Sequence, residues 1–306
     1  MIKSPTIINI SVTRGICPAN CIHCPVGKIK VDKRAELFGL GFMDVELFKK
    51  ICNESLEFKY KKPLLRIHGV GEPVCWKSLK EALIHAKEKG LKTWVFTSGL
   101  GKERQDFIDT LKYASIVEFS INSYDPKDYK KTKGLNEKYF YEVKKRIHLM
   151  HSLEKKPRLL ISRVESNSPK IDESFIKYWK KTKYADDVFI RSFHNYGQRI
   201  KDRKGILDSK EEAHYKIKSC LVPTSRMNID GVLGIVVRCF NELFEKEENV
   251  LKKAVGSIKN QNLISIWNGE VMESWRKDNF SYPECKNCKS CQAPNPNSSE
   301  KQINLC

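Results

Sequence analysis

The segment Arg14-Gly-Ile-Cys-Pro-Ala-Asn-Cys-Ile-His-Cys-Pro25 directly follows an apolar stretch, residues 7–12, that is typical of a buried strand. It places Cys17, Cys21 and Cys24 in a C-x3-C-x2-C pattern. Three thiolates at this spacing can bind three irons of a 4Fe-4S cluster, which leaves the fourth iron open to bind a small molecule and to transfer an electron. A zinc site, or thiols that bind no metal, is the alternative that this pattern alone leaves open.

The composition of the chain limits its size class and its environment. With 306 residues, 40% of them apolar, the chain can form one large domain or two. No segment approaches the ~20 consecutive apolar residues of a membrane span, and the first residues lack the long apolar region of a secretory signal. We therefore expect a cytoplasmic protein with no membrane partner. In such a reducing compartment, the 11 cysteines favour metal or redox sites over disulfides.

The formal net charge of +19 comes mainly from lysines in short, dispersed clusters. Basic clusters attract phosphates, so a nucleic-acid partner is one interpretation. The dispersion of the clusters and the lack of an RNA-binding motif favour the other interpretation, solvated helix faces. An acidic small substrate is also compatible with this charge.

Apolar runs alternate with helix-like stretches from residue 6 to residue 193. This pattern predicts strands at residues 7–12, 64–70, 91–97, 116–121, 159–164 and 188–193. It predicts helices at residues 43–58, 78–89, 102–113, 136–152 and 172–183. Repeated strand-helix units build an α/β fold with a parallel sheet and outer helices, and such folds place their chemistry at the carboxyl ends of the strands.

The strand-helix alternation stops near residues 200–215. Residues 227–238 are typical of a hairpin that turns at Asp230-Gly231. Residues 263–276 predict one amphipathic helix, although Gly269 weakens it. The last residues, 281–306, are rich in Pro, Asn and Ser and predict a loop held by its cysteines. We therefore expect a domain boundary after residue 205, between residues 1–205 and 206–306.

Three further motifs follow successive predicted strands. His68-Gly-Val-Gly-Glu-Pro73 follows the second strand, Thr97-Ser-Gly99 the third, and Ser120-Ile-Asn-Ser-Tyr-Asp-Pro126 the fourth. The glycines of the first motif let backbone groups approach a ligand, and its glutamate can bind a positively charged amino group. A plain turn is the alternative for this motif alone.

Together with the cysteine triplet, these motifs resemble those of the radical S-adenosylmethionine (radical SAM) enzymes. The resemblance implies a partial (β/α)6 barrel and a 4Fe-4S cluster whose open iron is chelated by S-adenosylmethionine. The glutamate motif resembles the family's Gly-Gly-Glu-Pro, with Val70 inserted between the glycines, and Asn122 stands where the family usually has Asp. The implied contacts of the cofactor are His23, Gly69, Gly71, Glu72, Pro73, Ser98, Ser120 and Asn122.

A second set of cysteines lies in the C-terminal part. Cys220 is followed by Gly234-Ile-Val-Val-Arg-Cys239 and by Pro283-Glu-Cys-Lys-Asn-Cys-Lys-Ser-Cys291. This spacing resembles the SPASM extension and the shorter twitch extension, which carry auxiliary clusters; a structural zinc site is the alternative. Two further complete clusters need eight thiolates, whereas this part has six cysteines. We therefore expect one auxiliary 4Fe-4S cluster, bound by Cys220, Cys239, Cys285 and Cys288, with Cys291 able to replace either of the last two.

The resemblance implies an enzyme that cleaves S-adenosylmethionine to a 5'-deoxyadenosyl radical, which removes hydrogen from a substrate C–H bond. A reductant such as flavodoxin or ferredoxin supplies the electron. The spacing is similar to that of 2-deoxy-scyllo-inosamine dehydrogenase-type enzymes, so we expect oxidation of a small, sugar- or cyclitol-like alcohol, with the auxiliary cluster as electron acceptor. Glu165, Arg191 and His194 are candidate proton acceptors, and a structural ion pair or a surface position is the alternative for each.

Other reactions use a similar chain. An epimerase would return hydrogen from a lone thiol, for which Cys291 or Cys306 is the candidate. A peptide maturase of the SPASM group would act on a peptide in place of a small molecule. An enzyme that modifies RNA would account for the basic charge and is the least favoured of these alternatives.

Overall fold

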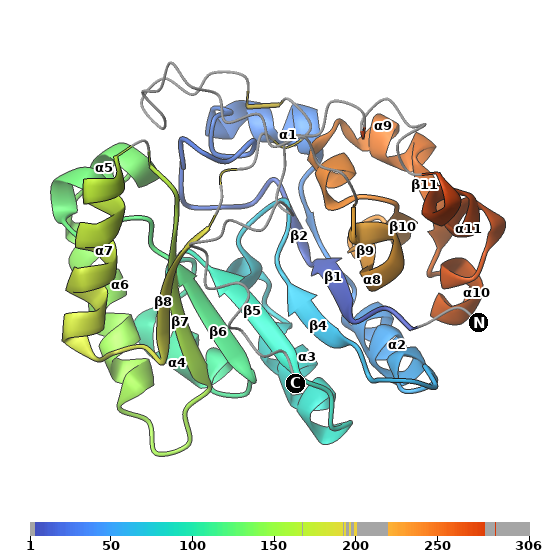
Figure 1. Cartoon of the computed structure of the whole chain (residues 1–306), viewed down its shortest axis with the longest axis horizontal. Coiled ribbons are helices and arrows are strands. Elements are labelled where there is room, and N and C mark those ends of the chain that lie inside the picture. Colours follow the sequence, from blue (N-terminus) through green and yellow to red (C-terminus); the bar gives the residue numbers. More distant parts are fainter. Residues whose placement is uncertain are drawn as a thin grey trace.

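The computed structural model describes residues 4–166, 168–191, 193, 196, 199–200, 220–278 and 285. Its main feature is a sheet of nine strands in the order β11-β10-β9-β1-β4-β5-β6-β7-β8, which is curved and open, with helices on its outer side (Figure 1). All six strands predicted before residue 200 are present and pair in parallel. They are β1 (Ile7–Ser11), β4 (Leu64–Ile67), β5 (Thr93–Thr97), β6 (Ile116–Ser120), β7 (Arg158–Val164) and β8 (Asp187–Arg191).

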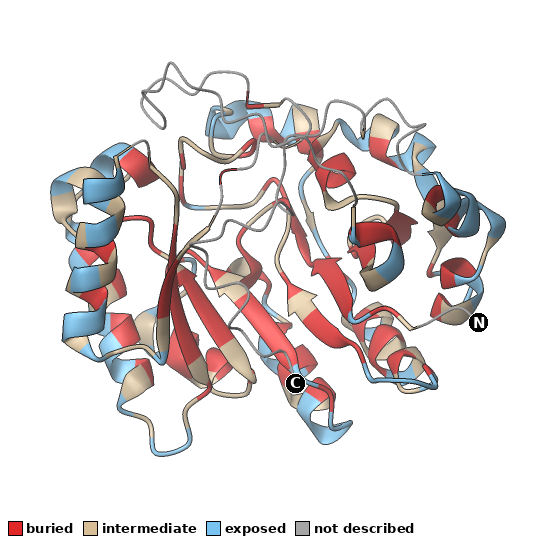
Figure 2. Ribbon diagram, in the orientation of Figure 1, coloured by how far each residue is buried: buried red, intermediate tan, exposed pale blue. Residues whose placement is uncertain are grey.

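The five predicted helices are also present, with bounds that differ from the predicted ones by a few residues. They are α2 (Val45–Ser55), α3 (Leu79–Glu88), α4 (Arg104–Leu111), α6 (Lys138–His151) and α7 (Pro169–Thr182). Each has apolar residues at helical spacing, and these pack on the outer face of the sheet, as Phe48 and Ile51 of α2 do. Figure 2 shows buried residues concentrated in the sheet and exposed residues on the outer helices. The α/β fold class is confirmed.

The predicted hairpin is present as β9 (Arg226–Asp230) and β10 (Ile235–Val237), which pair antiparallel. The Asp230 carboxylate accepts hydrogen bonds from the backbone of Val232 and of Leu233, which closes the turn. The sequence did not indicate that β9 pairs in parallel with β1, so that the hairpin extends the sheet. A further strand, β11 (Ala254–Ser257), pairs with β10 and forms the edge of the sheet. The boundary after residue 205 stays a prediction, because residues 201–219 lie outside the described part.

The single helix expected at residues 263–276 is wrong. Two short helices occupy this region, α10 (Leu263–Trp267) and α11 (Glu270–Lys277). Gly269 has extended backbone angles and is the N-cap of α11, so the helix is interrupted at the residue with the weakest helix propensity in the segment. Both helices lie near β11 at one end of the sheet, whereas α6 and α7 lie at the other (Figure 1).

Several short elements were not predicted from the sequence. After the cysteine triplet, helix α1 (Arg34–Phe38) lies between β2 (Thr13–Arg14) and β3 (Gly41–Phe42), which pair with each other. The remaining α-helices of the described residues are α5 (Pro126–Lys133), α8 (Val222–Ser225) and α9 (Glu247–Lys252), and short 3-10 helices span Val31–Lys33, Pro73–Cys75 and Phe240–Phe244. No helix in the described part is long and apolar enough to cross a membrane.

The inner face of the sheet changes from apolar to polar along the strands. Near their amino ends, inner side chains form a separate apolar cluster that includes Trp94, Leu160 and Phe189. Further along, the inner positions carry polar side chains, among them Asn9 of β1, Arg66 of β4, Glu118 of β6 and Asn228 of β9. This polar layer forms the floor of the pocket described next.

Candidate active site

A pocket lies on the inner face of the sheet and opens toward the carboxyl ends of the strands. Residues from five sequence motifs meet in it, although they are far apart in the chain. The predicted site residues that line it are Cys21, His23, Cys24, Gly69, Gly71, Glu72, Pro73, Ser98, Ser120, Arg191 and Cys239. The structure therefore brings two cysteines of the triplet, the glutamate motif and one C-terminal cysteine to a single site, whereas Cys17 is not among the lining residues.

The three N-terminal cysteines lie close enough to influence one another's ionisation. Burial, and next the neighbouring Cys21 thiol, raise the pKa of Cys24 to about 11, and burial together with Glu72 raises the pKa of Cys17. Among the described residues, no three His, Cys, Asp or Glu side chains converge as ligands of one ion do. The thiolates of a 4Fe-4S cluster bind different irons and need no common point, so this set of donors fits such a cluster. Cluster binding must displace the thiol protons.

Arg34 of α1 holds the cysteine loop in place and was not identified from the sequence. Its side chain is 1% exposed, and its guanidinium group donates to the carbonyl oxygens of Ile29 (3.1 Å), Cys17 (2.7 Å) and Ala19 (3.3 Å). It also donates to Asn20 Oδ1 at 2.6 Å. The planar guanidinium group has five N–H donors in fixed directions, so it can bind several oxygens of the loop at once.

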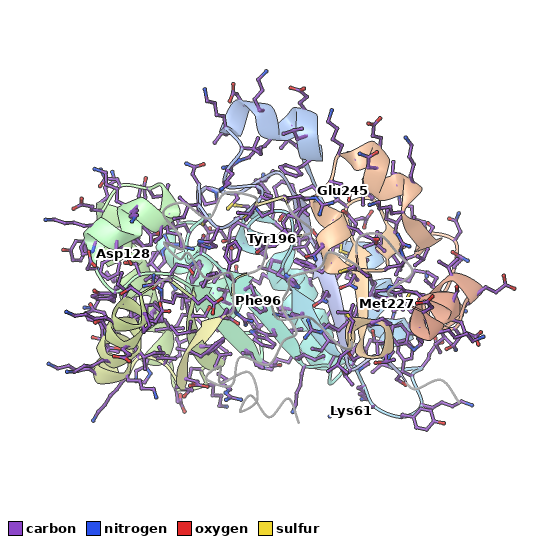
Figure 3. The ribbon with its side chains drawn as sticks, turned by 45° about the horizontal axis from the view of Figure 1, so that its top comes forward. Lys61, Phe96, Asp128, Tyr196, Met227 and Glu245 are labelled. Carbon is purple, nitrogen blue, oxygen red and sulfur yellow. The ribbon has the colours of Figure 1, made fainter. Side chains whose placement is uncertain are left out.

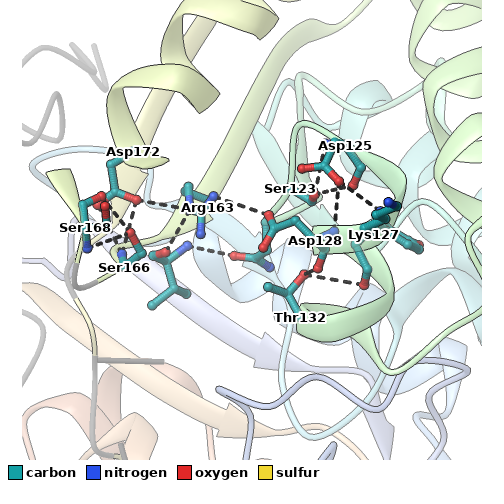
Figure 4. A network of polar contacts seen from close by, with 12 residues as sticks. Ser123, Asp125, Lys127, Asp128, Thr132, Arg163, Ser166, Ser168 and Asp172 are labelled. Carbon is teal, nitrogen blue, oxygen red and sulfur yellow. Dashed lines mark hydrogen bonds and ion pairs between the residues drawn. The ribbon is translucent and has the colours of Figure 1, made fainter. Parts of the chain in front are cut away.

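Helix α5 supports the same loop from the other side. The backbone N–H groups of Asn20 and Ile22 donate to the carbonyl oxygens of Lys133 (2.9 Å) and Thr132 (3.1 Å), at the end of α5. At the start of α5, the Asp125 carboxylate accepts from two backbone N–H groups of the first turn, those of Lys127 and Asp128 (Figure 4).

An ion-pair network fixes α5 relative to the last strands. Arg163 of β7 lies 3.5 Å from the Asp128 carboxylate of α5 and 3.2 Å from the Asp172 carboxylate of α7, and Figure 4 shows it between the two helices. Arg163 is buried, so replacing it would leave two carboxylates without this cation. The network therefore contributes to the position of the cysteine loop through α5.

Glu72 lies in the pocket wall with an exposed fraction of 3%. One carboxylate oxygen accepts from the Ser98 backbone N–H at 2.7 Å and the other from the Val74 backbone N–H at 3.3 Å. Burial raises the pKa of Glu72, and its hydrogen bonds partly oppose this shift. A buried carboxylate held in one orientation is suited to bind a cationic amino group.

The two glycines of the same motif are required by close packing. A Cβ atom at Gly71 would clash with the Thr13 side chain and would lie 2.6 Å from the carbonyl oxygen of Ile16. Gly69 has φ +145°, and a Cβ atom there would clash with the Ser11 side chain. The glycines thus let the segment after β4 pass close to β1 and β2 at the pocket.

Asn122 contacts two residues of the pocket lining, Ser120 and His23. It does not line the pocket, and its φ of +60° is one that Asn adopts more readily than most residues. Its amide nitrogen donates to Ser120 Oγ at 3.1 Å and contacts His23 Nε2 at 3.2 Å, and its oxygen accepts from the Val164 backbone at 2.7 Å. Asn122 therefore positions Ser120 and His23, which do line the pocket. Burial, Lys133 and Arg163 lower the pKa of His23 to about 3, so its imidazole is neutral at pH 7.

The candidate proton acceptors have different surroundings. Arg191 lines the pocket, and its Nε and Nη2 donate to the buried Glu118 carboxylate at 2.7 and 2.6 Å. A guanidinium group keeps its proton, so Arg191 acts as a cation and not as a proton acceptor. Glu165 does not line the pocket, and its carboxylate accepts from the Phe193 backbone at 2.9 Å. His194 and Cys291 lie outside the described residues.

Three of the four predicted auxiliary-cluster ligands are described. Cys239 follows β10 and lines the pocket, and Cys220 and Cys239 both pack against the main core. Cys285 is half-buried, and Cys288 lies outside the described residues. Cys239 is therefore one of several C-terminal residues that line the pocket, with Asn228 and Phe240 among the others.

The polar residues of the pocket floor were not predicted as site residues from the sequence. They are Asn9, Arg66, Glu118 and Asn228 on strands, and His68 directly after β4. The alternation in Leu64-Leu-Arg-Ile-His68 indicated a strand with polar side chains on one face. It did not indicate that this face points into a pocket and not into solvent.

Known proteins resemble this chain both in its C-terminal region and in its overall fold. Residues 220–292 match the family model of the SPASM iron-sulfur cluster-binding domain. BtrN in complex with AdoMet and 2-DOIA is 19% identical, with a TM-score of 0.53 and 95% of each chain covered. Streptococcus suis SuiB bound to precursor peptide SuiA is 13% identical, with a TM-score of 0.65, over 94% of this chain and 70% of SuiB. The chain has the radical SAM fold with a C-terminal SPASM region.

A third solved structure of this fold is native anSMEcpe with bound AdoMet and Cp18Cys peptide. It is 17% identical, with a TM-score of 0.60, over 94% of this chain and 86% of anSMEcpe. Among curated proteins, the UPF0026 proteins of two Helicobacter pylori strains are 29% identical over 127 residues, and the match spans 40% of this chain and 40% of their length. The SPASM model describes an iron-sulfur cluster-binding domain, and the structures of BtrN and anSMEcpe contain AdoMet.

Proposed function

We propose that the protein is a radical SAM oxidoreductase that removes hydrogen from a C–H bond of a small alcohol. The observation that carries this proposal is that Cys21, Cys24, Glu72 and Cys239 line one and the same pocket. The core cluster and S-adenosylmethionine, when bound, supply a 5'-deoxyadenosyl radical that abstracts the hydrogen atom. The protein's own contribution is to bind these groups, to orient the substrate and to exclude water.

Each part of the pocket has a role in this proposal. Cys17, Cys21 and Cys24 bind three irons, and Arg34 and α5 keep their loop in one conformation. Glu72 binds the amino group of S-adenosylmethionine. Gly71 has no side chain, so its backbone can pack against Thr13 and also face this ligand. Ser98 follows β5 and Ser120 is the last residue of β6, and both supply hydroxyl groups to the same wall.

Oxidation of an alcohol requires an acceptor for one electron and one proton after the hydrogen atom has left. Cys239 lines the pocket, which supports the auxiliary cluster as the electron acceptor. BtrN, whose structure contains 2-DOIA, matches this chain over 95% of both lengths and supports the same class of reaction.

We propose His68 as the proton acceptor, because a chain of hydrogen bonds orients its ring. Asn228 donates to the carbonyl oxygen of Arg238, a group that can only accept, at 2.7 Å. The Asn228 oxygen therefore accepts from Asn9 (2.7 Å), and the Asn9 oxygen accepts from His68 Nε2 (3.1 Å). In neutral His68 the lone pair is then on Nδ1, the atom that would take the proton.

Peptide maturation is the second candidate function. SuiB and anSMEcpe, whose structures contain peptides, match this chain with TM-scores of 0.65 and 0.60, higher than that of BtrN. In this alternative, the same radical would act on a peptide side chain. The reductant stays a prediction, and a nucleic-acid partner stays the less favoured alternative.

Anaerobic turnover distinguishes these reactions. The protein is reduced in the presence of S-adenosylmethionine and candidate alcohols, and 5'-deoxyadenosine and product mass are followed. The proposal predicts a product that has lost two hydrogens. An unchanged mass with uptake of solvent deuterium would indicate epimerisation, and a modified peptide would indicate maturation.

A further inference from the structure

Helix α5 packs one buried face against the cysteine loop. The buried residues of this helix are three and four positions apart, so they share one side of it; they are Tyr129, Thr132 and Lys133. The two neighbours of Cys21 in the chain, Asn20 and Ile22, donate their backbone N–H groups to carbonyl oxygens at the end of this helix, at 2.9 and 3.1 Å. Cys21 is therefore held between two contacts with α5, the helix on which Figure 3 labels Asp128.

The Tyr129 side chain on this face is completely buried, with an exposed fraction of 0%. Its ring packs edge-on against Phe140 of α6, with 5.9 Å between the ring centroids. Its hydroxyl group is buried as well, but it has no hydrogen-bond partner among the described residues. A buried hydroxyl group without a partner is costly, and native proteins retain few of them. Tyr129 therefore offers a hydrogen-bond donor that the described part of the chain does not use.

The ionisable groups with the strongest influence on the Tyr129 hydroxyl belong to the candidate active site. Burial raises the pKa of this phenol most, and the Cys21 thiol and then Glu72 raise it further. The hydroxyl group therefore keeps its proton at pH 7 and can donate a hydrogen bond. A cysteine thiol is only a weak acceptor, whereas the sulfur atoms of a bound cluster carry negative charge and accept more strongly.

We propose that Tyr129 donates a hydrogen bond to a sulfur atom of the core cluster beside Cys21, and that this bond raises the reduction potential of the cluster. The inference rests on the proposed function, because it concerns the core cluster of the same site. Hydrogen bonds to the sulfur atoms are one of the factors that set the potential of an iron-sulfur cluster. The reduced cluster carries one more negative charge than the oxidised cluster, so a donor stabilises the reduced form more.

A redox titration of the Tyr129→Phe variant tests this inference. The anaerobic holoprotein is titrated with dithionite without S-adenosylmethionine, and the reduced core cluster is measured by electron paramagnetic resonance. The signal of the auxiliary cluster is obtained from the triple variant Cys17→Ala, Cys21→Ala, Cys24→Ala and subtracted. At the midpoint potential of the wild-type core cluster, the ratio of reduced to oxidised cluster should be about tenfold lower in Tyr129→Phe, a shift of about 59 mV to more negative potential.

The matched control is Tyr141→Phe, which removes the hydroxyl group of a tyrosine of α6 that is 61% exposed. This control should keep the wild-type potential. Both variants should bind about eight irons. The apoproteins of both should keep the wild-type melting temperature, because no described residue makes a hydrogen bond with the Tyr129 hydroxyl group.

An unchanged potential in Tyr129→Phe, or an equal shift in Tyr141→Phe, would overturn the inference. A shift that occurs only after S-adenosylmethionine is added would also overturn it, because the hydroxyl group would then bind the cofactor and not the cluster. A loss of about four irons in Tyr129→Phe would do the same, since the hydroxyl group would then be needed to form the cluster. A wild-type protein that reduces its core cluster but oxidises no alcohol would contradict the proposed function and not this inference.

Discussion

Replacing Arg34 with methionine should release the core cysteine loop and prevent stable binding of the core cluster. The side chain is buried and makes four hydrogen bonds to the loop, at 2.6 to 3.3 Å. Charge-assisted bonds contribute about 1.5–3 kcal/mol each. The sum of the four contributions is larger than the loss of stability that nearly all single substitutions cause. The four bonds belong to one side chain, so their contributions are not additive, and relaxation of the loop recovers part of the loss. We therefore expect the free energy of unfolding to fall by about 3 kcal/mol, which is less than the total stability of an ordinary domain.

Iron content after anaerobic reconstitution, measured beside urea unfolding, checks this prediction. The wild-type protein should bind about eight irons and Arg34→Met about four, because the auxiliary cluster does not depend on this loop. The matched control is Arg104→Met, which removes two hydrogen bonds to Glu142 between outer helices. The control should keep its iron. Full iron content with wild-type stability in Arg34→Met would show that Arg34 does not hold the loop.

Other substitutions test single roles in the pocket. Glu72→Gln should weaken S-adenosylmethionine binding by about 10- to 100-fold and leave both clusters intact, and unchanged affinity in equilibrium dialysis would make the motif a plain turn. Gly71→Ala should lower both the melting temperature and this affinity, because its Cβ would lie 2.6 Å from a carbonyl oxygen; Gly90→Ala, whose nearest neighbour is 3.8 Å away, should leave the affinity unchanged. The Cys291→Ala variant should keep the iron content of the wild-type protein, whereas a loss of about four irons would show that Cys291 is a cluster ligand.

The strands and main helices could be predicted because their signals are local. Buried parallel strands are apolar runs, and outer helices show apolar residues at helical spacing. The motifs could be placed together because parallel strands carry their carboxyl ends at one edge of the sheet. The sequence therefore predicted that Glu72, Ser98 and Ser120 lie close together, and all three line the pocket.

The remaining features depend on contacts between distant residues. Arg191 and Glu118 are 73 positions apart, and Asn9 and Asn228 are 219 apart, so no local pattern pairs them. Arg34 has the sequence context of an exposed helix residue, and only the folded cysteine loop supplies its acceptors. The pairing of β9 with β1, which joins the C-terminal hairpin to the main sheet, is non-local in the same way.

Reductive cleavage of S-adenosylmethionine tests the central claim most directly. The reconstituted protein is incubated anaerobically with S-adenosylmethionine and dithionite, and methionine and 5'-deoxyadenosine are quantified. The account predicts that the wild-type protein forms both products and that the triple variant of Cys17, Cys21 and Cys24 to Ala, with about four irons left, forms neither. No cleavage by the fully loaded wild-type protein, or equal cleavage by the triple variant, would contradict it.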